Sequence, residues 1–299
     1  MPTLKQLRYF NALARCGHFG RAAEACSVTQ PALSMQIKAL EEELGTPLFE
    51  RLPEGARLTG AGAEIAGRAA AILTDMHDLA DLAQSRAGAL TGPLNLGVIP
   101  SVAPYLLPPL LPALRADFPA LQLSIRETQT DTLLRELSDG TLDLLLLALP
   151  IDQSEIETLP LFQDPFILAV PKDFDTGKNL RLPAELIRHE RLLLLEEGHC
   201  FRDQALAYCQ LREVGQVDTF GASTLTTVVQ MVAGGLGITF LPQMAVPVES
   251  RNPDVRLVAL EAPAPFRDIG LAWRRSSPRK AEFRAFGKSV LAAHDAAVK

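Results

Sequence analysis

The first sixty residues carry a spacing of apolar residues that fits a compact core of three short helices. Leu4, Leu7, Phe10 and Leu13 recur at three-residue steps, as on one face of a helix. An alanine-rich helix follows at 19–26. A third helix places its apolar residues within about 60° of one another at about 100° per residue. That stripe consists of Leu33, Ile37, Leu40 and Leu44.

The third helix has clear start and stop signals. Thr29 is the expected N-cap, Pro31 is tolerated in the first turn, and Gly45 is the expected C-terminal stop. Ser34 and Lys38 point away from the apolar stripe, and their direction follows from the helical period alone.

Two strand-length segments follow, at 48–51 and 57–59, with a turn at 53–55 between them. Two crossed helices followed by such a wing match the geometry that lays a second helix in the major groove of DNA. The same stripes also occur in three-helix cores that bind no DNA. The pattern by itself therefore leaves both interpretations open.

Charge and composition narrow the class of protein. The chain of 299 residues has a net charge of −6, but residues 1–60 carry seven Lys or Arg and six Glu, so the remainder carries −7. No stretch reaches the roughly 18 apolar residues of a membrane helix, and the N-terminus lacks an export signal. We therefore expect a cytoplasmic protein that makes no membrane contact, whose four cysteines are buried small residues or reactive thiols.

Specific motifs decide between the two interpretations of the first segment. Phe19-x-x-Ala22-Ala23, Val28-x-Gln30-Pro31-x-Leu33-Ser34, Ile37-x-x-Leu40-Glu41 and Leu44-Gly45-x-x-Leu48-Phe49-Glu50-Arg51 resemble the DNA-binding domain of LysR-type transcriptional regulators. The match is nearly continuous from Leu4 to Gly62. It implies a winged helix-turn-helix that binds double-stranded promoter DNA. The residues expected at the DNA are Gln30, Pro31, Ser34, Lys38, Arg51 and Arg57.

A long helical segment at 61–87 carries a second apolar pattern, with spacings of 4, 3, 4, 3 and 4 residues. This spacing is typical of a coiled-coil seam, although an amphipathic helix packed on its own domain would also use it. LysR-type proteins dimerise through this linker, so the resemblance favours a homodimer and a partly palindromic DNA site. The seam consists of Ile65, Ala69, Ile72, Met76, Leu79 and Ala83.

From Pro93 onward, short apolar strands alternate with helices, which predicts an α/β domain with parallel sheets covered on both faces. No glycine-rich nucleotide motif follows the first strand. The resemblance implies two lobes of the periplasmic-binding-protein type, with crossovers near Gln163 and Pro265. The predicted domains are a winged helix-turn-helix at 1–60, a linker helix at 61–88 and a two-lobed regulatory domain at 89–299. Strands are predicted at 94–99, 121–126, 142–149, 166–170, 191–195, 238–241 and 269–273, and helices at 105–118, 130–138, 203–212, 224–233 and 280–294.

Cys200 lies between a predicted strand and a predicted helix. Unpaired N–H groups at a helix N-terminus favour a thiolate, and His199 and Arg202 can add positive charge or hydrogen bonds. A thiolate is the species that attacks peroxide. Cys209 is nine residues further on. On one continuous helix the two would be about 13 Å apart, whereas a disulfide needs Cα atoms about 4.4–6.8 Å apart, so joining them would unwind the helix.

The run from Leu195 to Ala205, with Ile99-Pro100-Ser101, Glu127-x-Gln129-Thr130 and Arg267-x-Ile269, is similar to hydrogen-peroxide-sensing LysR-type regulators of antioxidant genes. The resemblance implies a peroxidatic Cys200, a resolving Cys209, a dimer-of-dimers tetramer and contact with RNA polymerase. Ser101 stands where a threonine is usual, so we expect its hydrogen bond to persist with looser packing. The expected peroxide pocket consists of Ser101, Thr130, His199, Arg202, Asp203 and Arg267.

Other interpretations remain at this point. Ser223, Thr224 and Thr227 open a helix where many LysR-type proteins bind a small anionic co-inducer, although N-capping by Ser223 explains that segment equally well. A thiol peroxidase would leave the helix-turn-helix unexplained, so we expect no enzyme. A metal at His199, Cys200 and Cys209 lacks a fourth ligand, and we expect neither metal nor cofactor. We interpret Cys16 and Cys26 as structural.

Overall fold

The computed structural model describes residues 1–53, 55–84, 90–175, 181–182, 190–211 and 222–298. Two compact units result, one from Met1–Arg86 with Ser138–Thr141 and the other from Ala87–Leu137 with Leu142–Lys299. Among the described helices, none combines the length and the apolar character that a membrane span requires.

The first unit is a helical core followed by a two-stranded wing and a long helix. Thr29 lies at the N-cap position of the third helix, as predicted, but its side chain makes no capping hydrogen bond. Gly45 ends the helix in the left-handed conformation at φ 69°. The hairpin pairs Phe49 with Leu58, and residue 54 of its turn lies outside the described part. The elements are α1 (Leu4–Cys16), α2 (Phe19–Ala25), α3 (Gln30–Leu44), β1 (Phe49–Leu52), β2 (Gly55–Leu58) and α4 (Gly60–Gln84).

Helix α4 divides into two parts by burial. Ala69 is fully buried, and Ile65 is half-buried against the core of the same unit. Further along, Ile72, Met76 and Leu79 are 46%, 43% and 60% exposed. The first part of the predicted seam thus packs on its own unit, and the second part leaves an apolar face uncovered. Residues 85–87 of the predicted helix and the side chain of residue 83 lie outside the part of the chain that the structure describes.

The second unit is built on one mixed sheet with the strand order β4-β3-β5-β10-β6-β9-β7, and β8 also pairs with β6. The elements of the first half are β3 (Gly92–Val98), α5 (Ala103–Asp117), β4 (Leu121–Glu127), α6 (Thr130–Ser138), β5 (Leu144–Leu149) and β6 (Ile156–Pro171). Those of the second half are β7 (Arg181–Leu182), α7 (Cys200–Leu211), α8 (Leu225–Ala233), β8 (Thr239–Pro242), η3 (Gln243–Ala245), α9 (Val246–Glu249), β9 (Val255–Leu260), β10 (Phe266–Arg274) and α10 (Lys280–Val298).

The expectation of parallel sheets holds only in part. Strand β3 pairs in parallel with β4 and β5, and β7 with β9, whereas β10 runs antiparallel to β5 and β6. The reason is that β6 and β10 form a long antiparallel ribbon beside the predicted crossovers, where Gln163 pairs with Asp268. The predicted strand at 191–195 was wrong: Leu192 and Leu195 form only isolated bridges.

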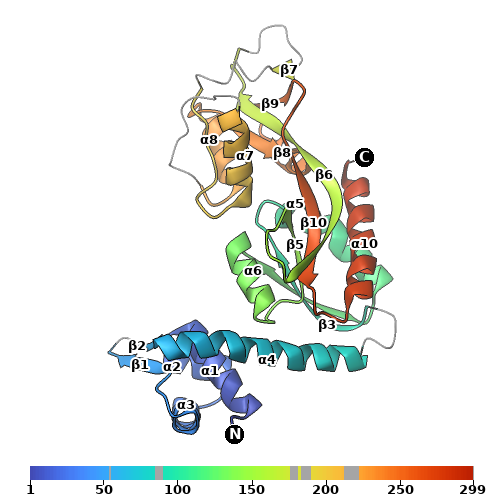
Figure 1. The fold of residues 1–299 in the computed structure, drawn as a ribbon. Helices are drawn as coiled ribbons and strands as arrows, with labels where there is room; N and C mark the ends of the chain where they lie inside the picture. The colour runs from blue at the N-terminus through green and yellow to red at the C-terminus, as the bar shows by residue number, and fades with distance from the viewer. Residues whose placement is uncertain (54, 85–89, 176–180, 183–189, 212–221, 299) are drawn as a thin grey trace. The chain divides into compact units, whose positions relative to one another are not determined.

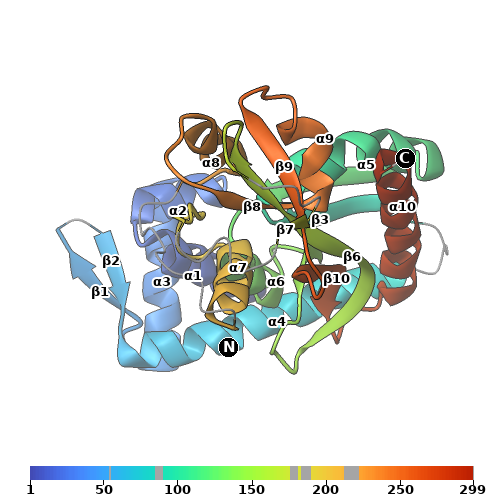
Figure 2. The same cartoon turned by 90° about the horizontal axis from the view of Figure 1, so that it is seen from above.

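The sheet divides into two lobes, which Figure 1 shows one above the other, and the 16-residue strand β6 runs through both. The first lobe holds β3, β4, β5 and β10 with helices α5, α6 and α10. The second lobe holds β7, β8 and β9 with α7, α8 and α9. Helices α5 and α10 pack side by side, as seen from above in Figure 2. Helix α6 lies on the other side of the sheet from α10 (Figure 1).

Candidate functional site

Cys200 is the first residue of α7 and contributes to the wall of a narrow, partly open cavity. Three segments distant in sequence meet there: the loop after β3, the residues at the start of α6, and the turn that leads into α7. The first two come from the first lobe and the third from the second lobe. The lining residues are Ile99, Pro100, Ser101, Gln129, Thr130, Gly198, His199 and Cys200.

The topology of the first lobe explains why two of these segments adjoin. Strands β3 and β4 are neighbouring parallel strands, so their carboxyl ends lie at the same edge of the sheet. The chain moves from β3 to β4 through α5 and then from β4 past β3 to β5 through α6. Connections that diverge in this way open a crevice at the carboxyl ends, where α/β proteins commonly bind ligands. Ser101 and Thr130 follow these two strands.

Ser101 is held by Arg267, which reaches it from β10. The guanidinium donates from Nη1 to the Ser101 hydroxyl at 2.7 Å and from Nη2 to the Ser101 carbonyl at 3.0 Å. Because the hydroxyl oxygen accepts a hydrogen bond from Arg267, its own proton can be donated elsewhere. The Ser101 hydroxyl thus takes part in a hydrogen bond within the described residues.

A buried ion pair fixes Arg267 in turn. Its Nε donates to Asp164 Oδ2 at 2.9 Å, and both side chains are 0% exposed. The other oxygen, Asp164 Oδ1, accepts from the backbone N–H of Met244 at 3.0 Å. The guanidinium also lies 5.2 Å from the centre of the Phe201 ring. Asp164 was not predicted, because it lies in the part of β6 that the sequence pattern missed.

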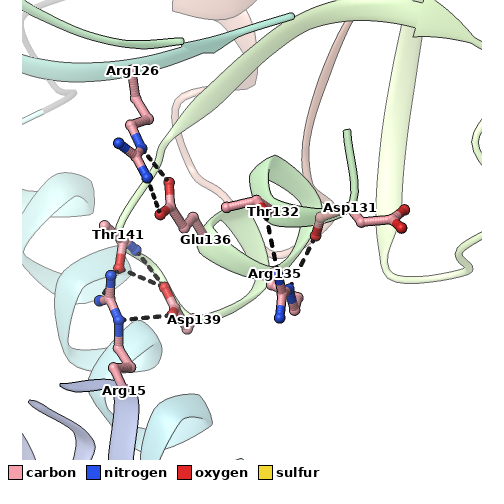
Figure 3. A network of polar contacts seen from close by, with 8 residues as sticks. All are labelled: Arg15, Arg126, Asp131, Thr132, Arg135, Glu136, Asp139 and Thr141. Atoms are coloured by element: carbon pink, nitrogen blue, oxygen red, sulfur yellow. Dashed lines mark hydrogen bonds and ion pairs between the residues drawn. The ribbon is translucent and has the colours of Figure 1, made fainter. Parts of the chain in front are cut away.

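Thr130 has a buried hydroxyl for which the described residues provide no hydrogen-bond partner. Buried hydroxyls are normally satisfied, so this one is available to a small polar ligand in the cavity. Figure 3 shows how its helix is held: Arg126 of β4 pairs with Glu136 at 3.3 Å, and Arg135 donates to the Asp131 carbonyl at 3.3 Å. The first contact ties α6 to the neighbouring strand, and the second lies within the helix.

His199 is buried beside Cys200. Burial penalises the charged imidazolium and lowers the pKa of His199 below its usual 6.5, while the nearby Glu196 carboxylate opposes that shift. The imidazole is therefore neutral near pH 7, with one nitrogen able to donate and the other able to accept a proton.

The lowered pKa of His199 makes stability depend on pH. An unfolded chain restores the ordinary pKa and binds a proton more readily, so stability is present above about pH 6.5 and is lost as the pH falls below it. One such group changes the free energy of unfolding by at most about 1.4 kcal/mol per pH unit. Denaturant unfolding at pH 7.5 and 5.5 should show a smaller acid loss in His199→Gln than in the unsubstituted chain. Equal losses would contradict a buried neutral imidazole.

The remaining predicted pocket residues lie behind or beside the cavity. Arg202 is buried and donates to the Leu195 carbonyl at 3.0 Å, which holds the turn before α7. Asp203 is exposed in the first turn of α7 and does not line the cavity. The structure thus brings together Ser101, Thr130, His199 and Cys200 directly, and Arg267 through Ser101.

The second cysteine of the predicted pair lies on the same helix as the first. Helix α7 is unbroken from Cys200 to Leu211, so it includes position 209. At about 1.5 Å per residue, the two positions are about 13 Å apart along the axis. A disulfide between them therefore requires part of α7 to unwind. The side chain of Cys209 lies outside the described part of the chain.

The alternative anion site has a simpler explanation. Thr224 is the N-cap of α8, and its hydroxyl accepts a hydrogen bond from the Thr227 N–H at 3.2 Å. The N-cap is therefore Thr224 and not Ser223, which is exposed. This hydroxyl already caps the N-terminus of α8.

The residues predicted to contact DNA lie on α3 and the wing. Gln30, Pro31 and Lys38 are exposed, and Lys38 pairs with Glu42 at 3.6 Å. Ser34 accepts a hydrogen bond from Arg51 of the wing at 3.3 Å. On the other wing strand, Arg57 pairs with Glu50 at 2.6 Å. The helix and the wing are thus joined on one polar surface of the first unit.

The two cysteines of the first unit, Cys16 and Cys26, are half-buried against its core. Burial raises the pKa of the Cys26 thiol, and the Arg8 guanidinium opposes that effect. A raised pKa disfavours the reactive thiolate.

Comparison with known proteins covers nearly the whole chain. Residues 4–63 match the bacterial regulatory helix-turn-helix of the lysR family, and residues 87–295 match the LysR substrate binding domain. A probable hydrogen peroxide-inducible genes activator of Streptomyces viridosporus is 43% identical over 97% of this chain and 93% of its own length. The DNA-binding transcriptional dual regulator OxyR of Escherichia coli K12 is 38% identical over 98% of this chain and 96% of its own.

Solved structures extend the similarity to three dimensions. A full-length OxyR from Pseudomonas aeruginosa, in which one cysteine is replaced by aspartate, has a TM-score of 0.79 and 38% identity, covering 97% of this chain and 98% of that one. A hydrogen-peroxide-bound OxyR of Corynebacterium glutamicum, in which one cysteine is replaced by serine, has a TM-score of 0.70 and 36% identity. It covers 100% of this chain and 94% of its own.

Proposed function

The chain belongs to the LysR family of DNA-binding transcriptional regulators, as an OxyR-like sensor of hydrogen peroxide, and we propose that Cys200 is the thiol that reacts. Cys209 is the resolving thiol in this proposal. The observation that carries it is the position of Cys200, at the start of α7 and on the wall of a cavity. Thr130 also lines this cavity, with a buried hydroxyl that has no hydrogen-bond partner among the described residues.

The chemistry proceeds in two balanced steps. The Cys200 thiolate attacks one oxygen of hydrogen peroxide, so that an S–O bond forms as the O–O bond breaks, and the departing hydroxide takes a proton to become water. The Cys209 thiolate then attacks the sulfur of the sulfenic acid. An S–S bond forms, the S–O bond breaks, and the departing hydroxide takes a proton and leaves as a second water. The two thiols are oxidised by two electrons in total, and one peroxide is reduced.

The residues around Cys200 suit the first step. Ser101 and Thr130 can hold the peroxide oxygens through hydrogen bonds, and the neutral imidazole of His199 can pass a proton to the departing oxygen. Arg267 acts indirectly, by fixing the Ser101 hydroxyl.

Trapping of the sulfenic acid tests this assignment. In a Cys209→Ser chain, one equivalent of peroxide should give a sulfenic acid at Cys200 that reacts with dimedone. The adduct should be absent from the Cys200→Ser chain. A dimedone adduct at another cysteine, or none at Cys200, would overturn the proposal.

We propose that the first unit binds promoter DNA through α3 and the wing, with Arg51 and Arg57 at phosphates. Among the described residues no carboxylate is paired with Arg51, whereas Arg57 is already paired with Glu50. Arg51→Ala should therefore lower the salt dependence of DNA affinity by about 0.9 in log–log slope, and Arg57→Ala by less. Fluorescence anisotropy across a salt series measures both slopes. A larger change for Arg57→Ala would contradict this order.

We propose that the chain is a homodimer through the exposed part of α4, as an element of a dimer-of-dimers tetramer. The uncovered face of Ile72, Met76 and Leu79 supports this interface. A Met76→Glu, Leu79→Glu chain should show a lower mass in light scattering and weaker binding to a two-half-site duplex. The control is Arg68→Glu, on the exposed polar side of α4. An unchanged mass for the double variant would place the interface elsewhere.

The remaining expectations belong to the same proposal. The protein acts in the cytoplasm, where thiols are reduced, and regulates antioxidant genes through RNA polymerase. It is a switch and not an enzyme, so peroxide consumption should stop after about one equivalent per chain. Sustained turnover with a thiol reductant would indicate a peroxidase instead.

A further inference from the structure

A hydrogen bond at the cavity joins the first lobe to the second. The side-chain amide of Gln129, from the first lobe, donates to the backbone carbonyl of Glu197, in the turn before α7, at 3.1 Å. The next residue, Gly198, has φ 88°, and a Cβ on it would lie 2.5 Å from the Gln129 amide oxygen. The amide therefore lies directly against the turn that leads to His199 and Cys200.

The other end of this link is firmly held. The backbone carbonyl of Gln129 accepts from the N–H groups of Thr132 and Leu133 at 3.1 and 3.0 Å, so it begins the hydrogen bonding of α6. Helix α6 is tied to β4 by the pair between Arg126 and Glu136 (Figure 3). Gln129 thus extends from a fixed helix start in one lobe to a turn in the other.

We propose that Gln129 is a positioning residue for the reaction with peroxide, and this inference rests on the proposed role of Cys200. Its amide holds the turn before α7 against the first lobe, which keeps Cys200 beside the hydroxyls of Ser101 and Thr130. Gln129 has no part in bond making or breaking.

The two chemical steps require opposite states of the hydrogen bond between Gln129 and Glu197. Attack on peroxide needs Cys200 at the cavity, where the first lobe supplies hydroxyls. Disulfide formation needs the start of α7 to leave, since position 209 is about 13 Å away along the helix. The hydrogen bond from Gln129 favours the first arrangement and opposes the second. Its loss should slow formation of the sulfenic acid and accelerate formation of the disulfide.

A purely structural hydrogen bond would behave differently. Its loss would lower the melting temperature and shift both steps in the same direction, or neither. The opposite signs of the two changes therefore distinguish positioning from general stabilisation.

The test uses the full-length chain with Gln129→Met, which keeps the length of the side chain and removes the donor. Gln122→Met is the control, because Gln122 is exposed on β4. Acid quenching and thiol mapping after mixing with peroxide give the rate constants of both steps. We expect the first to fall and the second to rise, each by roughly 2- to 10-fold, the range for one hydrogen bond. Alkylation of Cys200 by iodoacetamide does not depend on hydrogen bonds to peroxide, so its rate in Gln129→Met should not fall.

Gln129→Glu provides a second variant of nearly equal shape that also lacks the donor and should change the two rates in the same opposite directions. Changes of the same sign in both steps, or rates equal to those of Gln122→Met, would overturn the role of Gln129. If the unsubstituted chain forms no sulfenic acid at Cys200, the proposed role of Cys200 is wrong. This result differs from those that would contradict the role of Gln129 alone, so the two claims are tested separately.

Discussion

Replacing Asp164 with alanine should lower the free energy of unfolding of the regulatory unit by about 3–5 kcal/mol. The substitution leaves the guanidinium of Arg267 without a counterion at a position where both side chains are 0% exposed. It also removes the acceptor of the Met244 N–H. Breaking a buried pair from one side is costly because the remaining charge stays desolvated. Urea unfolding followed by the fluorescence of Trp273 measures the effect.

A matched control lies on the same strand. Glu157 of β6 also pairs with two cations, Lys280 at 2.8 Å and Arg284 at 3.0 Å, but at a partly exposed position. Glu157→Ala should cost no more than about 1 kcal/mol, as is usual for pairs near the surface. Equal losses for Asp164→Ala and Glu157→Ala would show that burial of the Arg267 pair does not stabilise the unit.

Replacing Cys200 with serine should abolish the effect of peroxide on DNA binding. A serine hydroxyl does not ionise near pH 7 and cannot form a sulfenic acid, so the first step has no nucleophile. The footprint on promoter DNA should be the same before and after one equivalent of peroxide, and it should match that of the reduced unsubstituted chain. A protected region that still changes after peroxide would show that another group senses it.

Cys26→Ser provides the control for this substitution. It removes one thiol from the same chain, but that thiol is half-buried, and its pKa is raised by burial. The footprint of Cys26→Ser should therefore still change with peroxide, as in the unsubstituted chain. Loss of the response in this variant would move the sensor into the DNA-binding unit.

The helices were the most predictable part of the fold. Those of the first unit depend on contacts within a few turns, so apolar spacing and the stop at Gly45 sufficed. Helix α6 has the predicted bounds, and α7 begins three residues before the predicted start, at Cys200 itself. This difference matters, because it places Cys200 in the first turn of the helix.

The strands between the lobes were less predictable. The first ten residues of β6 show only a weak alternation of apolar and polar side chains, and the sequence pattern did not predict β9. The strands that pair with them come from distant parts of the chain. Asp164 interrupts the apolar residues of β6 and is paired only after β10 brings Arg267 beside it. A period-two pattern cannot show such a partner.

The residues of the candidate site that stand in a short sequence motif were predictable. Cys200 and His199 stand in one motif, and Ser101 and Thr130 follow strands that the sequence located. The link from Gln129 to Glu197 depends on how the second lobe approaches the first, which no local pattern contains.

One measurement tests the central claim most directly: mapping of all disulfides by mass spectrometry after one equivalent of peroxide is added to the reduced, full-length chain. We predict a single new bond between Cys200 and Cys209, with Cys16 and Cys26 still reduced, and reversal by a thiol reductant. An oxidised chain without the Cys200–Cys209 bond, or with its new disulfide at Cys16 or Cys26, would contradict the proposed switch.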